Sequence, residues 1–115
     1  LDFIVIAQTG NAVDFGDLAV AREGLAQGCI SNGSRGIFSG GNTPTNINTI
    51  EFITFATLGN ATDFSADLTD ARRDVAGTQS TTRGLFAGGR NSGNTITANI
   101  DQITLDLKDY LNLIW

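Results

Sequence analysis

The sequence repeats itself, and this repeat limits the folds open to the chain more than any other feature. Residues 2–15 recur at 51–64, residues 17–22 at 67–72 and residues 35–41 at 83–89, so the copies lie 48–50 positions apart. The spacing changes only in Gly-, Asn-, Ser- and Thr-rich stretches, where loops accept insertions at little cost. A third copy opens at residues 100–104. We predict one domain over residues 1–115: two permuted repeats (2–49 and 51–100), then the first strand of a third repeat and a C-terminal tail (101–115).

Each repeat carries the pattern of short β-strands. Residues 50–57 are rich in Ile, Phe and Thr and are followed by Gly-Asn, and residues 83–87 form a short apolar run before a double glycine. Both patterns indicate a strand that ends at a turn. The other expected strands are hairpin partners within 22–30 and 72–79, and outer strands at 14–21 and 63–71. Four short strands in about 50 residues predict an all-β fold of four-stranded antiparallel propeller blades, two per chain.

Two segments allow other structures. Residues 65–76 also fit a helix, with Leu68 and Val75 near helical spacing and Ser65 as N-cap. The first copy carries Gly16 and Gly24 in the same stretch, and each costs a helix roughly 1 kcal/mol, so we favour a strand. Residues 105–115 remain open between a strand, a short helix and an exposed apolar tail.

The composition excludes several classes of function. The chain has 12 acidic and 7 basic residues, so its net charge of −5 repels nucleic acid and anionic lipid. It has no His and one Cys, which removes the commonest general base and metal ligand, an internal disulfide and a thiolate zinc site. No signal peptide or long apolar run is visible. We expect no cofactor, no metal, no nucleic acid and no membrane partner.

Three elements of the repeat resemble a Kelch-type repeat: Arg-x-x-Leu-Ala at 22–26, Arg-Gly-Ile-Phe-Ser-Gly-Gly at 35–41 and Ile-Glu-Phe-Ile at 50–53. The element Gly-Asn-Ala-x-Asp-Phe, at 10–15 and 59–64, is similar to the Kelch-like repeats of bacteriophage virion proteins, particularly those of marine phages and metagenomes. The resemblance implies a virion or extracellular location. It marks as structural repeat residues Arg22, Arg35, Gly40, Gly41, Arg72, Arg83, Gly88 and Gly89. The Tyr and Trp that usually follow the double glycine are replaced here by Ile50, Phe52 and their equivalents.

Two repeats are fewer than a propeller needs, since propellers close with about four to eight blades. Either the chain belongs to a longer propeller, or copies assemble into a ring. Three chains of two blades would close a six-bladed ring. We therefore expect self-association, with a homotrimer favoured.

The loop after each double glycine holds the candidate ligand-binding residues: Asn42, Thr43, Asn46, Asn48, Arg90, Asn91 and Asn94. Their amides, hydroxyl and guanidinium suit sugar hydroxyls, and loops on a rigid scaffold commonly carry binding. The simpler interpretation is a pair of solvated loops.

The repeated charged residues have two interpretations each. The arginines at positions 22, 35, 72 and 83 could hold an acidic glycan, or could pair with a carboxylate such as Asp14 or Asp17 or their equivalents. The aspartates Asp14, Asp17, Asp63, Asp67 and Asp70 could bind Ca²⁺ or cap turns. We favour the structural interpretation in both cases.

These observations predict a non-enzymatic structural or adhesive module of a phage particle, which presents loops to a host-surface glycan or to another virion protein. The alternative is an oligomeric propeller lectin with defined sugar pockets. A copper radical oxidase, by analogy with an enzyme that shares Kelch-type blades, would need His ligands that the sequence lacks.

Overall fold

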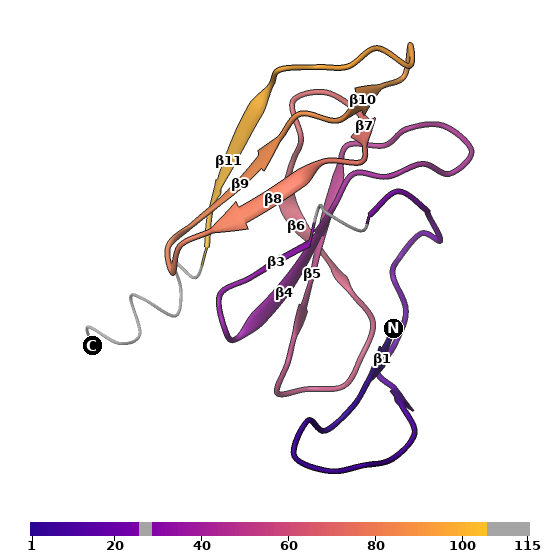
Figure 1. Ribbon diagram of the computed structural model, residues 1–115, viewed down its shortest axis with the longest axis vertical. Coiled ribbons are helices and arrows are strands. Elements are labelled where there is room, and N and C mark those ends of the chain that lie inside the picture. Colours follow the sequence, from indigo (N-terminus) through magenta and orange to yellow (C-terminus); the bar gives the residue numbers. More distant parts are fainter. Residues whose placement is uncertain (26–28, 106–115) are drawn as a thin grey trace.

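The computed structural model describes residues 1–25 and 29–105, and every regular element in them is a β-strand (Figure 1). The strands are β1 (Asp2–Phe3), β2 (Val13–Asp14), β3 (Cys29–Ser31), β4 (Arg35–Ser39), β5 (Thr49–Thr54), β6 (Thr62–Asp67), β7 (Arg72–Arg73), β8 (Ala76–Gln79), β9 (Arg83–Ala87), β10 (Arg90–Asn91) and β11 (Ile100–Thr104). All pairings between these strands are antiparallel, so the predicted all-β class is confirmed.

The first full sheet contains β3, β4, β5 and β6 in that order, each strand hydrogen-bonded to the next one along the chain. In β4 and β5 the register pairs Ile37 with Phe52 and Phe38 with Glu51. The β5–β6 pair is irregular, and Ser65 in β6 has a φ of 75°. A sheet of four short antiparallel strands is as the sequence predicts, but it crosses the predicted repeat boundary, since β5 spans residues 49–54 and β6 belongs to the second repeat.

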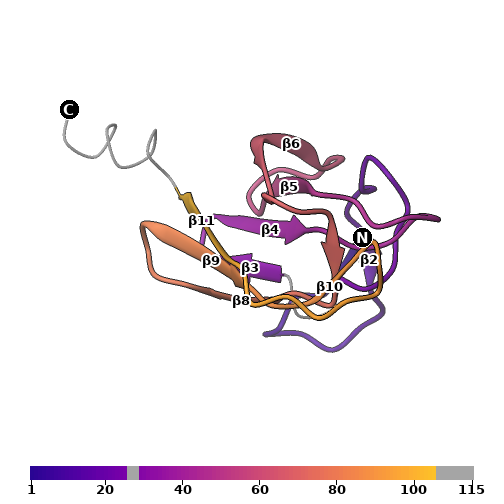
Figure 2. The ribbon, with the colours of Figure 1, turned by 90° about the horizontal axis from the view of Figure 1, so that it is seen from above.

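The second sheet repeats the first three strands of this order, as β8, β9 and β11. Figure 2 shows β6, β5, β4 and β3 in succession, with β3 beside β8 of the second sheet. Ile30 and Ile37 of the first sheet share a buried core with Phe86 and Ile103 of the second. Gly84 permits this contact, because a Cβ there would meet the end of the Ile30 side chain. The two sheets therefore pack by their apolar faces.

The β1–β2 pair has the local structure of β5–β6, 49 positions earlier. Phe3 packs edge-to-face on Phe15 with ring centroids 6.0 Å apart, and Phe52 packs in the same way on Phe64 at 6.1 Å. The repeat found in the sequence is thus also a repeat in side-chain packing.

Three expectations need correction or lie outside the structure. The helix considered at residues 65–76 is wrong, since this stretch contains the end of β6, all of β7 and the start of β8. The outer strand of the first copy is only two residues long and ends before Gly16, which has a φ of 146° and approaches the backbone of Gly59 too closely for a side chain. The predicted tail lies outside the described residues beyond Leu105. In the described chain, no helix has the length and apolar character that a membrane span requires.

Candidate functional site

Arg22 and Arg72 occupy equivalent places, and each forms an ion pair with a carboxylate of the following repeat. Arg22 Nη2 lies 3.1 Å from Glu51 Oε2, and Arg72 Nη1 lies 3.0 Å from Asp101 Oδ2. The side chains of both arginines are fully buried. Buried in this way, neither guanidinium is available to an acidic glycan. The predicted structural role of these two arginines agrees with the geometry.

The carboxylate of Asp101 is held by Thr69 as well as by Arg72. The Thr69 N–H donates to Oδ2 at 3.0 Å and the Thr69 hydroxyl donates to Oδ1 at 2.8 Å. Burial alone raises the pKa of Asp101, but these hydrogen bonds and the Arg72 charge outweigh it and lower the pKa below its ordinary value. Asp101 is therefore a carboxylate that the fold keeps ionised. The first repeat keeps the backbone part of this arrangement, with the Ala19 N–H donating to Glu51 Oε1 at 3.1 Å, but Ala19 has no hydroxyl to match that of Thr69.

The partners expected for these arginines, Asp14 and Asp17, are wrong. Both aspartates are exposed, and the carboxylates that pair with Arg22 and Arg72 come from β5 and β11 instead. Within residues 1–25 and 29–105, no three His, Cys, Asp or Glu side chains gather closely enough to hold a metal ion. The arrangement thus gives no geometric support to the calcium interpretation.

The other repeated positions are two arginines at the starts of β4 and β9 and the double glycines that follow these strands. The Arg35 guanidinium lies 4.5 Å from the centre of the Phe52 ring, as a cation–π contact, whereas Arg83 is exposed at the start of β9. Gly40 and Gly88 have φ values of 63° and 69°. A Cβ on Gly40 would collide with the Arg72 carbonyl, so the double glycine lets the chain turn tightly against its neighbour.

The two double-glycine loops lie at the same end of the molecule (Figure 1). Between them is an open polar cavity of about 200 Å³. Its described lining residues are Asn42, Pro44, Thr45, Asn46, Arg73, Asn91, Ser92 and Asn94. The Asn46 amide donates to the Arg90 carbonyl at 2.9 Å and so joins the loop of one repeat to the loop of the next. Within the second loop, the Asn91 side chain accepts from the N–H groups of Gly93 and Thr95, both at 3.0 Å. This cavity between repeats is the candidate functional site.

The predicted ligand-binding residues divide into two groups. Asn42, Asn46, Asn91 and Asn94 line the cavity. The others have backbone roles at its edge: the Thr43 N–H donates to the Thr45 carbonyl at 2.8 Å, the Asn48 carbonyl accepts from Leu68 at 2.8 Å, and the Arg90 carbonyl holds Asn46. The structure brings the two predicted loops into one site, although they are 48 residues apart in the chain.

Sequence analysis missed Arg73, the cationic residue among those that line the cavity. Its side chain is 35% exposed, whereas that of the neighbouring Arg72 is fully buried. The signal was present in the alignment of the two repeats, where Arg22-Glu23 corresponds to Arg72-Arg73. The charge changes sign at this one place, so the repeats differ where they form the cavity.

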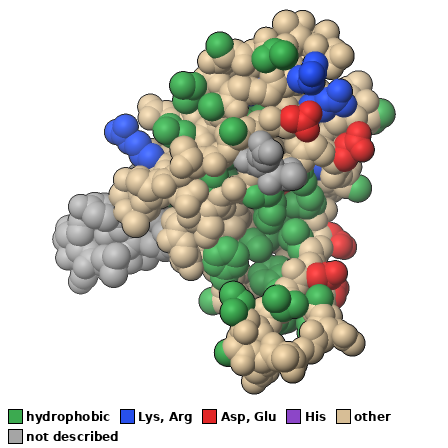
Figure 3. Space-filling model, viewed as in Figure 1, with side chains coloured by type: hydrophobic (Ala, Val, Ile, Leu, Met, Phe, Trp, Pro, Cys, Tyr) green, Lys and Arg blue, Asp and Glu red, His purple; other side chains and the backbone are tan. Residues whose placement is uncertain are grey.

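An apolar groove of about 470 Å³ lies on the other face of the first sheet, beside the N-terminal strands. Its described lining residues are Leu1, Asp2, Phe3, Ile4, Phe15, Phe38, Ile53, Phe55 and Leu58. Figure 3 shows hydrophobic side chains gathered on the surface of the lower half of the molecule. Phe55 is 47% exposed and Ile4 is 63% exposed, so the groove is only partly covered.

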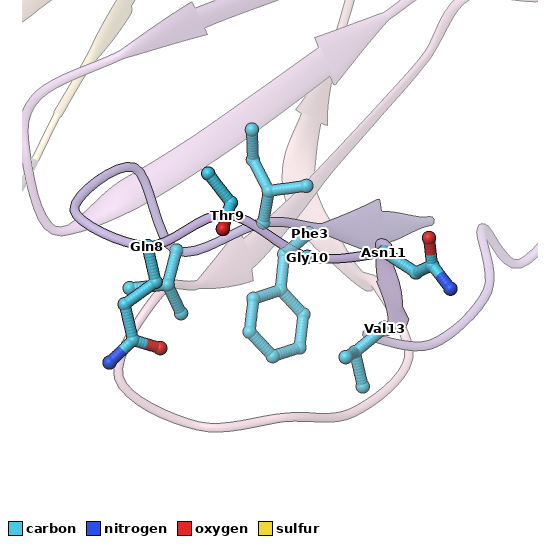
Figure 4. Close-up of a pocket in the computed structure, with 8 residues that line it drawn as sticks. Phe3, Gln8, Thr9, Gly10, Asn11 and Val13 are labelled. Atoms are coloured by element: carbon cyan, nitrogen blue, oxygen red, sulfur yellow. The ribbon is translucent and has the colours of Figure 1, made fainter.

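A smaller hollow of about 140 Å³ lies under the loop that joins β1 to β2. Figure 4 shows Phe3 and Val13, partners in the β1–β2 register, projecting on the same side of the chain, with Gln8 beyond Phe3. Its described lining carries no charged side chain. This hollow therefore has a neutral lining, and none of its described side chains is a charged group that could bind an ion.

Cys29 is exposed, and not buried as a small apolar residue commonly is. Its Sγ donates to the Leu25 carbonyl at 3.4 Å. Neighbouring groups still partly desolvate the thiol and raise its pKa, and the Arg22 charge lowers that pKa by less, so the thiol is protonated at neutral pH. Cys29 therefore lacks the thiolate character of a catalytic cysteine.

Comparison with protein-family models found no match, and comparison with curated proteins found none either.

Proposed function

We propose that the chain is a Kelch-like β-propeller module in which the two sheets are successive blades. Three observations support this: the strand order β3-β4-β5-β6 repeated as β8-β9-β11, the position of β3 beside β8, and the same ion pair between each repeat and the next. Blades of a propeller are four-stranded antiparallel sheets that pack on one another with their first strands near a common axis.

We further propose that copies of the chain associate head to tail through the apolar groove. The equivalent face of the second sheet is covered, since Phe86 and Leu105 there are 0% and 2% exposed. In the groove of the first sheet, the equivalent residues Phe38 and Phe55 are half-buried and 47% exposed. The residues that cover Phe86 and Leu105 of the second sheet include Ile37 and Ile50 of the first sheet.

A second copy offers the equivalents of these covering residues on an uncovered face. By the strand registers, Leu85 corresponds to Ile37 and Ile100 to Ile50. Leu85 and Ile100 lie on the face of the second sheet opposite to Phe86, and Ile100 is 69% exposed. Packing this face onto the groove of the next copy is a heterologous contact, which closes into a ring when the rotation allows. Three copies would give six blades.

In this proposal the module is a non-enzymatic structural or adhesive part of a phage particle, located on the virion or outside the cell. The support is the resemblance of the repeat motifs, together with loops held rigidly at one end of the two sheets. Weak contacts repeated around a ring would gain avidity for a host-surface glycan or for another virion protein.

The observation that carries the proposal is the repeated ion pair between successive units, and the experiment that tests it is the solution mass. Light scattering on a size-exclusion column should give about three times 12.1 kDa. A monodisperse monomer at all concentrations would overturn the ring.

A second candidate function is an oligomeric lectin, and the polar cavity between the two loops favours it. Binding to a glycan array distinguishes the two proposed functions. A lectin binds a defined sugar, and Asn46→Ala abolishes that binding, because Asn46 ties the two loops together. A purely structural module gives no sugar-specific signal.

A further inference from the structure

The short β7–β10 pair places two arginines opposite each other, Arg73 and Arg90. Like charges directly across an antiparallel pair destabilise it. The cost is not a consequence of a generally basic surface, since the chain has a net charge of −5. Figure 3, in the same view as Figure 1, shows basic side chains grouped near the end where β7 and β10 lie, with acidic side chains beside them. The direct opposition of two arginines in one short strand pair calls for a physical reason.

The first repeat shows that the fold does not require two cations at this place. There the equivalent pair is Glu23 opposite Asn42, and the Asn42 amide lies 3.5 Å from Glu23 Oε1 as its donor. The first repeat thus pairs an acceptor with a donor, while the second pairs two donors. Two donors side by side match a ligand that supplies the acceptors.

The contacts of the two arginines leave room for such a ligand. Arg73 Nε lies 3.8 Å from Asp74 Oδ2, and its Nη2 lies 3.5 Å from Asn94 Oδ1. Arg90 Nη1 donates to the Asn94 carbonyl at 3.4 Å. These distances are all long for charge-assisted hydrogen bonds, which are typically about 2.7–2.9 Å. Both guanidinium groups can therefore form stronger bonds than they now have.

The cavity beside them supplies groups of a different kind. Its described lining carries one cation, Arg73, and no carboxylate; the other lining side chains are asparagine amides, the hydroxyls of Thr45 and Ser92, and Pro44. Its volume of about 200 Å³ is below the roughly 300–1,000 Å³ of pockets for drug-sized ligands. The space suits one sugar residue with several hydroxyl groups.

We propose that this cavity binds a carboxylate-bearing sugar residue, with Arg73 of its lining on the carboxylate and the asparagines on the hydroxyl groups. Arg90 is not a lining residue, but it lies opposite Arg73 in the β7–β10 pair and would reach the same carboxylate from beside the cavity. Guanidinium groups recognise carboxylates by paired hydrogen bonds, and amides can both donate to and accept from a sugar hydroxyl. The proposal rests on the adhesive function proposed above and names the chemical class of its ligand. It assigns the acidic-glycan role to arginines other than the four repeated ones.

Calorimetric titration of the full chain with glucuronic acid and with glucose tests the proposal. Glucuronic acid should bind more tightly than glucose, and Arg73→Gln should weaken it by at least about tenfold, the effect of losing one charge-assisted hydrogen bond. Arg73→Glu, which introduces the residue found in the first repeat, should abolish the preference. Arg83→Gln is the matched control, because Arg83 is exposed at the other end of β9 and the charge change is the same.

Equal affinity for the two sugars, absence of binding, or an equal loss in Arg83→Gln would overturn the carboxylate site. A preference for a sulfated sugar over glucuronic acid would overturn the choice of carboxylate. The same samples report their mass by light scattering. A trimer that does not bind glucuronic acid rejects this site and retains the propeller ring, whereas a monomer that binds it rejects the ring and retains the site.

Discussion

Arg72 Nη1 lies 3.0 Å from Oδ2 of Asp101, and Nη2 of the same guanidinium donates to the Phe86 carbonyl at 3.1 Å. Arg72 is the first residue of β7, which follows the first sheet in the chain, and Asp101 is the second residue of β11. The contact therefore connects β7 to the third strand of the second sheet. Burying a guanidinium in this way is costly unless a charge and hydrogen bonds compensate it. The pair therefore makes the position of one sheet depend on the other.

Replacing Asp101 with Asn leaves Arg72 buried without its counter-charge. Removing one partner of a buried pair destabilises a protein by about 3–5 kcal/mol, and we expect a loss of free energy of unfolding in this range. Urea unfolding followed by circular dichroism measures it. Asp63→Asn removes the same charge from an exposed position of β6 and should change stability by less than about 0.5 kcal/mol. Equal losses would show that the pair has no special role.

The lowered pKa of Asp101 predicts an acid-sensitive stability. In the folded chain this pKa lies below its ordinary value of 3.8, so the stabilisation is complete above 3.8 and is lost as the pH falls through the folded pKa. The free energy of unfolding should decrease over this range in the natural chain. Asp101→Asn should show a smaller decrease, and identical pH profiles for the two proteins would contradict the assignment.

Gly40→Ala should destabilise the fold by more than Gly33→Ala. Both glycines have positive φ, 63° and 95°, so both alanines carry backbone strain of order 1–3 kcal/mol. Only Gly40 has an additional obstacle, since its Cβ would meet the Arg72 carbonyl, whereas nothing lies within 4 Å at Gly33. Thermal unfolding gives the Tm of each variant, and the difference between the two Tm values measures the effect of the collision beyond that of the backbone strain. A Tm for Gly33→Ala as low as that of Gly40→Ala would show that strain alone decides.

The proposed head-to-tail contact predicts that a charge on either side dissociates the assembly. Phe55→Asp in the groove and Ile100→Asp on the covering face should each give the monomer mass by light scattering, with unchanged circular dichroism. Both side chains are substantially exposed in the single chain, so its fold tolerates the change. Ile96→Asp is the control: Ile96 is 73% exposed in the loop after β10 and lies outside the groove lining. An equal effect of Ile96→Asp would rule out this interface.

The elements that sequence analysis predicted correctly are those with a local signature. Ile, Leu and Phe before the double glycines indicate β4 and β9, and Ile-Asp-Gln-Ile-Thr, which opens the third copy of the repeat, indicates β11. The partner of Arg72 was missed because it lies 29 residues away, where no local pattern applies. Yet the two arginines and the two acids each recur after 50 positions, which keeps that separation constant and could have indicated the pairing.

The polar cavity shows a different limit of prediction from sequence. The two loops could be identified from composition, but their meeting depends on the packing of two sheets whose relative position no single repeat encodes. Arg73 departs from the repeat, since the first copy has Glu23 at this position, so the agreement between the copies does not indicate it. In a duplicated chain the positions that differ between copies are free to acquire a ligand, while those that agree maintain the fold.

The ion pair between consecutive repeats also favours one order and one register of docking between them. Units with nearly the same surface could dock in the wrong order or one residue out of register, and hydrophobic contacts alone discriminate poorly among such alternatives. If a repeat docks in the wrong order or register, the buried arginine and the buried carboxylate lose each other as partners, and each remains an unpaired charge in apolar surroundings. The second repeat carries both partners, because Glu51 pairs with Arg22 of the repeat before it and Arg72 pairs with Asp101 of the repeat after it. A gene duplication that adds one repeat therefore adds a complete connector, so arrays of different length can evolve without a new interface.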